Sequence, residues 1–309
     1  MKYLMLFLAC CLTLYSGFSQ QKNTAEKLGY PKNAKLLIIH ADDLGVAHSV
    51  NEASTKAFEK GGITSASIMV PCAWFPEIAA YAKQHPELDW GIHTTFTAEW
   101  KNYKWDAVLP ANEVAASIAV DGYLYPSVET FASHAKPAEV EKELRAQIER
   151  AQSFGIALSH IDNHMGSLLF TPSMLQVYFK VAKEFKLAML APRLLLQVYP
   201  PQVIATVDTS NVVFLDELIM APDTIKPSNW KAYYDNAINN LKPGLTEIIV
   251  HLAYDDAEMK AISIDHPDYG AAWRQRDYDY VNSDAFKNLL KKKGIILVKW
   301  KDVQGVMYK

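Results

Sequence analysis

The sequence is poor in cysteine and has no large excess of charge of either sign. Its 309 residues include three cysteines, and two of them, Cys10 and Cys11, lie in an N-terminal apolar run. Removal of that run would leave Cys72 alone, so the remaining chain could form no internal disulfide. Acidic and basic residues are mixed along the chain, and the formal net charge is -3. The lack of a basic stripe argues against nucleic acid as a partner.

Long apolar runs are also absent after the N-terminus. Lys2 precedes an apolar run from Tyr3 to Tyr15, which is too short to span a bilayer as a helix. Small residues follow it, so we predict a signal peptide at residues 1–19; a buried N-terminal helix is the alternative. We therefore expect an exported protein, periplasmic or secreted, with no transmembrane segment in the mature chain. A lipid anchor is not expected, because cleavage at either cysteine of the run would truncate it.

Beyond a predicted leader at residues 20–34, a single domain is expected at 35–309. There, short apolar runs alternate with stretches of helical spacing, and strands that alternate with helices pair in parallel. About eight such units predict an α/β fold, an irregular TIM-like β/α barrel with outer helices. An open doubly wound sheet is the alternative. The predicted strands are 35–40, 65–70, 88–93, 157–161, 187–190, 211–215, 246–251 and 294–298, and the predicted helices are 50–60, 138–154, 172–185, 229–241 and 283–293.

Ionisable side chains stand where several predicted strands end. Because the carboxyl ends of parallel strands form one rim of a β/α barrel, we expect these side chains to meet there. A carboxylate with two imidazoles suits one divalent metal ion, such as Mg, Zn or Mn. Two adjacent carboxylates need separate tasks, because neighbouring strand residues point in opposite directions unless a turn redirects one. The side chains are those of Asp42 and Asp43, His93, His160 with Asp162 and His164, Arg193, and His251.

Each of these residues also has an ordinary structural interpretation. Asp43 could cap the helix that follows it. His93 could be a hydrogen-bonded structural residue. Asp162 could orient a neighbouring histidine rather than bind metal itself. The occurrence of the whole set on one rim favours a metal centre over several separate structural roles.

Four segments, taken in order, resemble motifs of the YdjC-like carbohydrate deacetylases, and the resemblance extends from Lys35 to Val303. The resemblance implies a deacetylase-type β/α barrel related to the polysaccharide deacetylases. It also implies that Asp43, His93 and His164 hold the metal. The matching segments are Leu37–Gly45 followed by Asn51, Gly62–Val70, Gly91–His93 and Ser159–His164.

The same resemblance implies roles for three further residues. Asp42 matches the general base that acts on water, His251 the acid that protonates the leaving amine, and Arg193 an arginine that orients the base. Three positions depart from the family pattern: Leu44 stands in place of Phe, Gly166 where many members have a histidine, and Leu252 in place of Pro. Leu44 affects packing only, whereas Gly166 and Leu252 concern the surroundings of the substrate.

The activity implied is metal-dependent removal of acetyl groups from N-acetylated amino sugars or oligosaccharides. Trp100 and Trp105 in one long insert (98–137), and Trp273 in another (254–280), are candidates for stacking on sugar rings. The alternative is that they pack the inserts onto the barrel. Two other functions stay open, namely another metal-dependent hydrolase (an amidohydrolase or phosphodiesterase) and a non-catalytic carbohydrate-binding relic.

Overall fold

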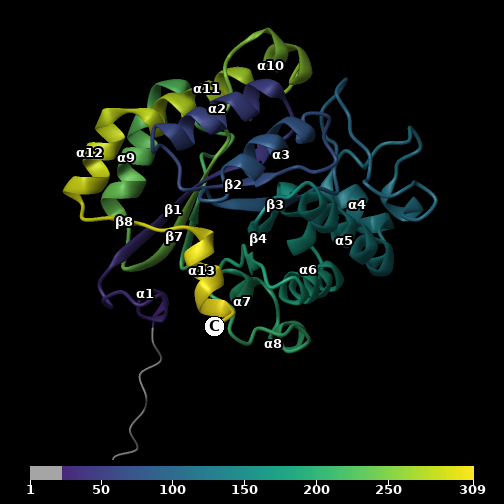
Figure 1. The fold of residues 1–309 in the computed structure, drawn as a ribbon, viewed down its shortest axis with the longest axis horizontal. Helices are drawn as coiled ribbons and strands as arrows, with labels where there is room; N and C mark the ends of the chain where they lie inside the picture. Colours follow the sequence, from purple (N-terminus) through teal and green to yellow (C-terminus); the bar gives the residue numbers. More distant parts are fainter. Residues whose placement is uncertain (1–22) are drawn as a thin grey trace, which may run out of the picture.

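A computed structural model describes residues 23–309, and its centre is a sheet of parallel strands (Figure 1). The strand order is β5-β4-β3-β2-β1-β7-β6, and β8 pairs with β1. The strands are β1 Lys35–Leu44, β2 Ser65–Ile68, β3 Trp90–Thr94, β4 Leu158–Asn163, β5 Ala188–Met189, β6 Glu217–Ile219, β7 Gly244–Val250 and β8 Ile296–Leu297. The predicted TIM-like α/β fold is therefore confirmed.

The sheet curls into an irregular barrel. Its two edge strands are β5 and β6. An isolated parallel bridge joins Pro192, just after β5, to Leu215, just before β6. The strand predicted at 211–215 is wrong, because β6 begins at Glu217. Asn211 has a φ of 60°, a left-handed conformation that interrupts an extended strand.

Buried apolar residues explain the two longest central strands. All seven residues of β7 are buried, as are nine of the ten residues of β1, so both faces of these strands are covered. The helices present apolar stripes to the sheet. In α5 (Pro137–Ser153) the residues Val140, Leu144, Ile148 and Ala151 recur every three or four positions and are fully buried.

The other helices of the alternating pattern also form near the predicted positions. In Figure 1, α9 and α12 lie on one side of the sheet and α4, α5 and α6 on the opposite side. The bounds are α2 His48–Glu59, α3 Phe75–Gln84, α4 Val128–His134, α6 Pro172–Glu184, α7 Leu195–Val198, α8 Pro201–Ile204, α9 Trp230–Asn240, α12 Asp284–Lys292 and α13 Trp300–Met307, with 3-10 turns η1 Ala115–Ser117, η2 His164–Leu169 and η3 Pro227–Asn229.

The two inserts differ in structure. The insert at 98–137 is mostly irregular, whereas the insert at 254–280 contains α10 (Ala257–Ile262) and most of α11 (Ala271–Asn282). Both helices pack against α2.

The N-terminal predictions are only partly open to structural comparison. The predicted signal peptide lies outside the described residues. Within the predicted leader, α1 (Thr24–Lys27) contacts β7 and buries Ala25. Among residues 23–309, no helix has the length and apolar character needed to cross a membrane.

Candidate metal centre and active site

The end of β1 redirects two adjacent carboxylates into one buried site. The pairing of β1 with β2 is irregular between Ala41 and Leu44, and Asp43 adopts a left-handed φ of 63°. Aspartate tolerates this conformation better than most residues with a side chain. The next turn needs Gly45, whose φ is 94° and whose added Cβ would lie 2.9 Å from the Met69 carbonyl oxygen. This turn is the redirection that two neighbouring strand residues require if they are to serve one site.

Asp43, His93 and His164 form a compact triangle of potential ligand atoms. Asp43 Oδ1 lies 3.3 Å from His93 Nε2 and 3.3 Å from His164 Nδ1. The two histidine nitrogens are also 3.3 Å apart. All three side chains are buried, and Asp43 Oδ1 accepts no hydrogen bond from the part of the chain that the structure describes. One carboxylate oxygen and two imidazole nitrogens around a common point fit a divalent cation. The structure thus brings together the three predicted ligands, each from a different part of the chain.

Asp162 orients one of these histidines. Its Oδ1 lies 2.8 Å from His93 Nδ1, and its Oδ2 lies 2.9 Å from His40 Nε2 and accepts a 2.8 Å bond from the Ser67 hydroxyl. Burial alone would raise the pKa of Asp162, but the charge of His93 and hydrogen bonds from both histidines hold it well below its usual range. An ionised Asp162 accepts the Nδ1 proton of His93 and leaves Nε2 free to face Asp43. The predicted orienting role is therefore the one the contacts support.

His164 is oriented by a residue from the first insert. Its Nε2 lies 2.9 Å from Glu99 Oε2, so its Nδ1 is the nitrogen directed toward Asp43. Directly after it, Met165 and Gly166 have φ values of 54° and 70°. These two residues with left-handed backbone conformations turn the chain sharply away directly after His164.

Asp42 and His251 form a second pair beside the triangle. Asp42 Oδ1 is 3.4 Å from His251 Nε2, and Asp42 Oδ2 is 3.9 Å from His93 Nε2. Neither Asp42 Oδ1 nor His251 Nδ1 has a hydrogen-bond partner within residues 23–309. Burial, with the nearby Asp43 charge, raises the pKa of Asp42 to about 7, and burial lowers the pKa of His251 to about 3. His251 is thus neutral at neutral pH and must gain a proton before it can donate one.

Arg193 does not join this site, and its predicted role in orienting Asp42 is wrong. Its Nε and one terminal nitrogen donate to Asp216 Oδ1 at 3.0 and 2.8 Å, and it also contacts Thr24 in α1. Asp216 in turn accepts from the backbone of Leu245, at the start of β7. The chain beyond β5 therefore carries Arg193 to the α1 side of the barrel rather than to the carboxylate cluster.

The guanidinium at the site belongs instead to Arg274, in α11. Its terminal nitrogen donates to Asp43 Oδ2 at 2.7 Å, and the side chain is 98% buried by contacts from both inserts. No signal in the sequence pointed to this role, because Arg274 lies within a long insert rather than at the end of a strand. His40 and Glu99 were also missed, although His40 stands inside the first strand, two residues before Asp42.

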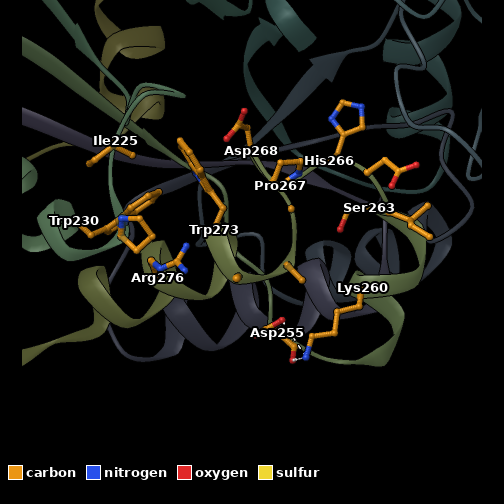
Figure 2. Close-up of a pocket in the computed structure, with 16 residues that line it drawn as sticks. Ile225, Trp230, Asp255, Lys260, Ser263, His266, Pro267, Asp268, Trp273 and Arg276 are labelled. Carbon is orange, nitrogen blue, oxygen red and sulfur yellow. Dashed lines mark hydrogen bonds and ion pairs between the residues drawn. The ribbon is translucent and has the colours of Figure 1, made fainter.

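The three candidate tryptophans are all buried. The Trp105 ring centroid lies 6.1 Å from that of His164, and Trp100 lies beneath the Arg274 guanidinium at 5.7 Å. Trp273 packs on Tyr269, which packs on His251 at 4.8 Å. Figure 2 shows Trp273 in the wall of a neighbouring cavity of about 620 Å³. Trp100 and Trp105 therefore pack beside Arg274 and His164, whereas Trp273 contacts Tyr269 and lines the cavity.

Fold and site together define an α/β-barrel protein with a buried Asp–His–His cluster suited to a divalent cation. The family model described as YdjC-like protein matches residues 36–292, and the chain belongs to this family. It is 30% identical over 263 residues to a carbohydrate deacetylase of Thermus thermophilus, covering 82% of this chain and 88% of the relative. It is 29% identical over 223 residues to a carbohydrate deacetylase of Geobacillus stearothermophilus, covering 72% and 81% respectively.

A solved structure supports the fold independently. It is the structure of an Enterococcus faecalis V583 protein whose proposed role is cellobiose-phosphate cleavage. The two chains superpose with a TM-score of 0.72 at 23% identity, covering 87% of this chain and 99% of the other. At this identity the similarity establishes the fold, not the reaction.

Proposed function

We propose that this protein is a metal-dependent hydrolase that removes the acetyl group from N-acetylated amino sugars or their oligosaccharides and releases acetate. The observation that carries the proposal is the triangle of Asp43 Oδ1, His93 Nε2 and His164 Nδ1, with sides of 3.3 Å, beside the Asp42–His251 pair. The names of the curated relatives support the substrate class and the bond that is broken.

The triangle would hold one divalent ion, with Mg, Zn and Mn as the candidates. Such an ion supplies Lewis-acid chemistry, which polarises a carbonyl and lowers the pKa of water. The protein supplies proton transfer. Asp42 would act as the general base: one of its oxygens has no hydrogen-bond partner in the described chain and could accept a proton from the attacking water. His251 lies 3.4 Å from that oxygen and is placed to pass a proton on to the departing amine.

The cavity beside Trp273 is lined by none of the proposed catalytic or metal-binding residues, so we propose that it binds a part of an oligosaccharide other than the acetamide that reacts. The cavity has a volume of about 620 Å³, within the range of small-molecule sites. Trp273 and Trp230 form an apolar part of its lining, and Asp255 and Asp268 contribute polar groups able to bind hydroxyls (Figure 2). Trp100 and Trp105 support the metal centre in this proposal, and Trp273 is the one tryptophan of the three that is placed to contact a sugar.

The N-terminal sequence supports a location outside the cytoplasm. Residues 1–19 have the basic start, apolar run and small residues of a cleavable signal peptide. We propose export to the periplasm or beyond the cell, where acetylated cell-surface or environmental sugars would be encountered. N-terminal sequencing of the protein recovered from the host would test this, and a retained Met1 would contradict it.

Two substitutions at neighbouring positions test the proposed reaction. Asp43→Asn should abolish both metal uptake and acetate release, because it removes a ligand charge. Asp42→Asn should retain metal, and its rate of acetate release should fall by at least about 100-fold, because general-base catalysis typically accelerates a reaction on the order of 10²–10⁴-fold. Metal content is measured after dialysis, and acetate is measured with N-acetylglucosamine oligomers of increasing length.

The outcomes separate this proposal from its alternatives. Normal hydrolysis by Asp42→Asn would exclude Asp42 as the base. Oligomer binding without acetate release by the metal-loaded parent would indicate a carbohydrate-binding relic. Hydrolysis of a phosphodiester instead of the acetamide would indicate a different metal-dependent hydrolase.

A further inference from the structure

Arg274 is held at the metal centre by contacts from three directions. Its Nε donates to the Tyr269 carbonyl at 2.6 Å, and one terminal nitrogen donates to Asp43 Oδ2 at 2.7 Å. The ring of Trp100 lies 5.7 Å from the guanidinium carbon. These contacts fix the direction from which Arg274 approaches Asp43.

The two oxygens of Asp43 consequently have different surroundings. Oδ2 accepts a hydrogen bond from Arg274, whereas Oδ1 has no donor among the described residues and lies 3.3 Å from each of the two histidine nitrogens. A carboxylate can bind a cation through one oxygen or through both. Here the second oxygen is already occupied by a charge-assisted hydrogen bond, which is among the stronger protein hydrogen bonds.

We propose that Arg274 is a positioning residue that restricts Asp43 to one metal-coordinating oxygen and thereby keeps a coordination position open for water and substrate. This inference rests on the proposed metal centre. A catalytic metal site needs an open position, unlike a structural site whose ligands are all supplied by the protein. Arg274 secures that position without contributing a ligand of its own.

The electrostatics argue for a functional reason for this arginine. A buried cation close to a divalent ion repels it, so Arg274 lowers the affinity that Asp43 could otherwise give. Its other terminal nitrogen is buried and has no hydrogen-bond partner among the described residues. A buried donor left without a partner is destabilising, so hydrogen bonding within the described residues does not by itself explain the position of Arg274.

Cobalt(II) is the probe for this inference, because its visible absorption weakens as the number of ligands rises. The test compares the full-length protein with Arg274→Gln, Arg274→Lys and Arg276→Gln. Arg276 lies on the same helix but stacks on Trp230, with its guanidinium 5.6 Å from that ring, so Arg276→Gln is the matched control.

We expect cobalt absorption in Arg274→Gln to fall below that of the parent, because both oxygens of Asp43 become free to bind the ion. Arg274→Lys should show a smaller fall, since the ammonium can still donate to Oδ2 but loses the bond to Tyr269. Arg276→Gln should match the parent in cobalt absorption; only its spectrum is compared, because Arg276 lines the cavity proposed for the sugar. Catalysis by the parent and the two Arg274 variants should follow the order of their spectra, with the loss in kcat rather than in KM, because the open position and not sugar binding is altered.

Far-ultraviolet circular dichroism of the metal-free proteins verifies that each variant is folded, and the lysine variant serves if the glutamine variant is not. Unchanged spectra in the folded Arg274 variants would overturn the inference while leaving the proposed function intact. Failure of the parent itself to bind cobalt would instead overturn the metal centre and the inference together.

Discussion

Asp162→Asn is the substitution that best separates the scaffold of the site from its ligands. Asp162 lies outside the ligand triangle, yet its two oxygens accept from His93, His40 and Ser67 at 2.8, 2.9 and 2.8 Å. An asparagine of nearly the same shape keeps one acceptor oxygen and turns the other into a donor. That donor must then face either His93 or the pair formed by His40 and Ser67, each of which offers a proton.

The expected loss follows from the two possible orientations of this amide. If the donor faces His93, the histidine loses the group that holds its Nδ1 proton and directs Nε2 to Asp43. If it faces His40, a buried donor is left unsatisfied, at a cost of about 1–3 kcal/mol. Removal of a carboxylate that orients a metal-binding histidine weakens metal affinity by about 10–100-fold. This factor corresponds to about 1.4–2.7 kcal/mol.

Metal affinity of Asp162→Asn is measured by competition with a chromogenic chelator, on the folded fraction determined by circular dichroism. Asp89→Asn is the matched control, since Asp89 is also a buried carboxylate but accepts from Ser159 and from the backbone of Trp300 at the start of α13. The control should lose stability and retain the metal affinity of the parent. An unchanged metal affinity in folded Asp162→Asn would refute the orienting role of Asp162. An equal loss of metal affinity in Asp162→Asn and Asp89→Asn would show that the effect comes from a general weakening of the core.

Three further substitutions test other parts of the description. Burial raises the pKa of Glu247 from 4.5 to about 7, so between these pH values the folded state binds more protons than the unfolded state and the free energy of unfolding falls as pH rises. Glu247→Gln should remove this fall, which amounts to up to about 3 kcal/mol over the range and is measured by urea unfolding at several pH values. Arg193→Gln should leave acetate release unchanged. It should lower the free energy of unfolding by less than about 1 kcal/mol, because the ion pair between Arg193 and Asp216 is exposed. A tenfold loss of kcat would restore the predicted catalytic role of Arg193. Gly91→Ala should lower stability by about 1–3 kcal/mol in thermal unfolding, since its Cβ would lie 2.3 Å from the ring of His160, and an unchanged Tm would contradict that close packing.

The convergence of Asp43, His93 and His164 could be predicted from sequence because each stands at or just after the end of a strand, whereas their selection as metal ligands came from the family resemblance. Parallel strands deliver their carboxyl ends to one rim, so identifying the strands was sufficient to bring these residues together. The same reasoning gave the wrong result for Arg193, since β5 is only two residues long and the chain beyond it brings Arg193 to Asp216 and to Thr24 in α1. A short edge strand fixes the direction of the following residues poorly.

Arg274 could not be predicted in this way. It is separated from Asp43 by 231 positions and reaches the site from the side of helix α11. Its contact with the centre depends on how the insert folds back, which is set by tertiary packing such as that between α11 and α2 rather than by local sequence. Helical spacing could indicate that α11 exists, but not that one of its arginines is buried against a carboxylate.

Asp42, Asp43 and Asp162 show why residue type alone does not assign a chemical task. Burial would raise the pKa of each, but Arg274 and two histidines hold that of Asp43 well below its usual range, and His93 and His40 do the same for Asp162. Asp42 has no such set of donors, and its pKa is raised. Two of the three carboxylates are thus kept ionised, one to face a cation and one to orient a histidine. The third keeps an oxygen close to His251 that has no hydrogen-bond donor among residues 23–309, which is the arrangement that the proposed proton transfer requires.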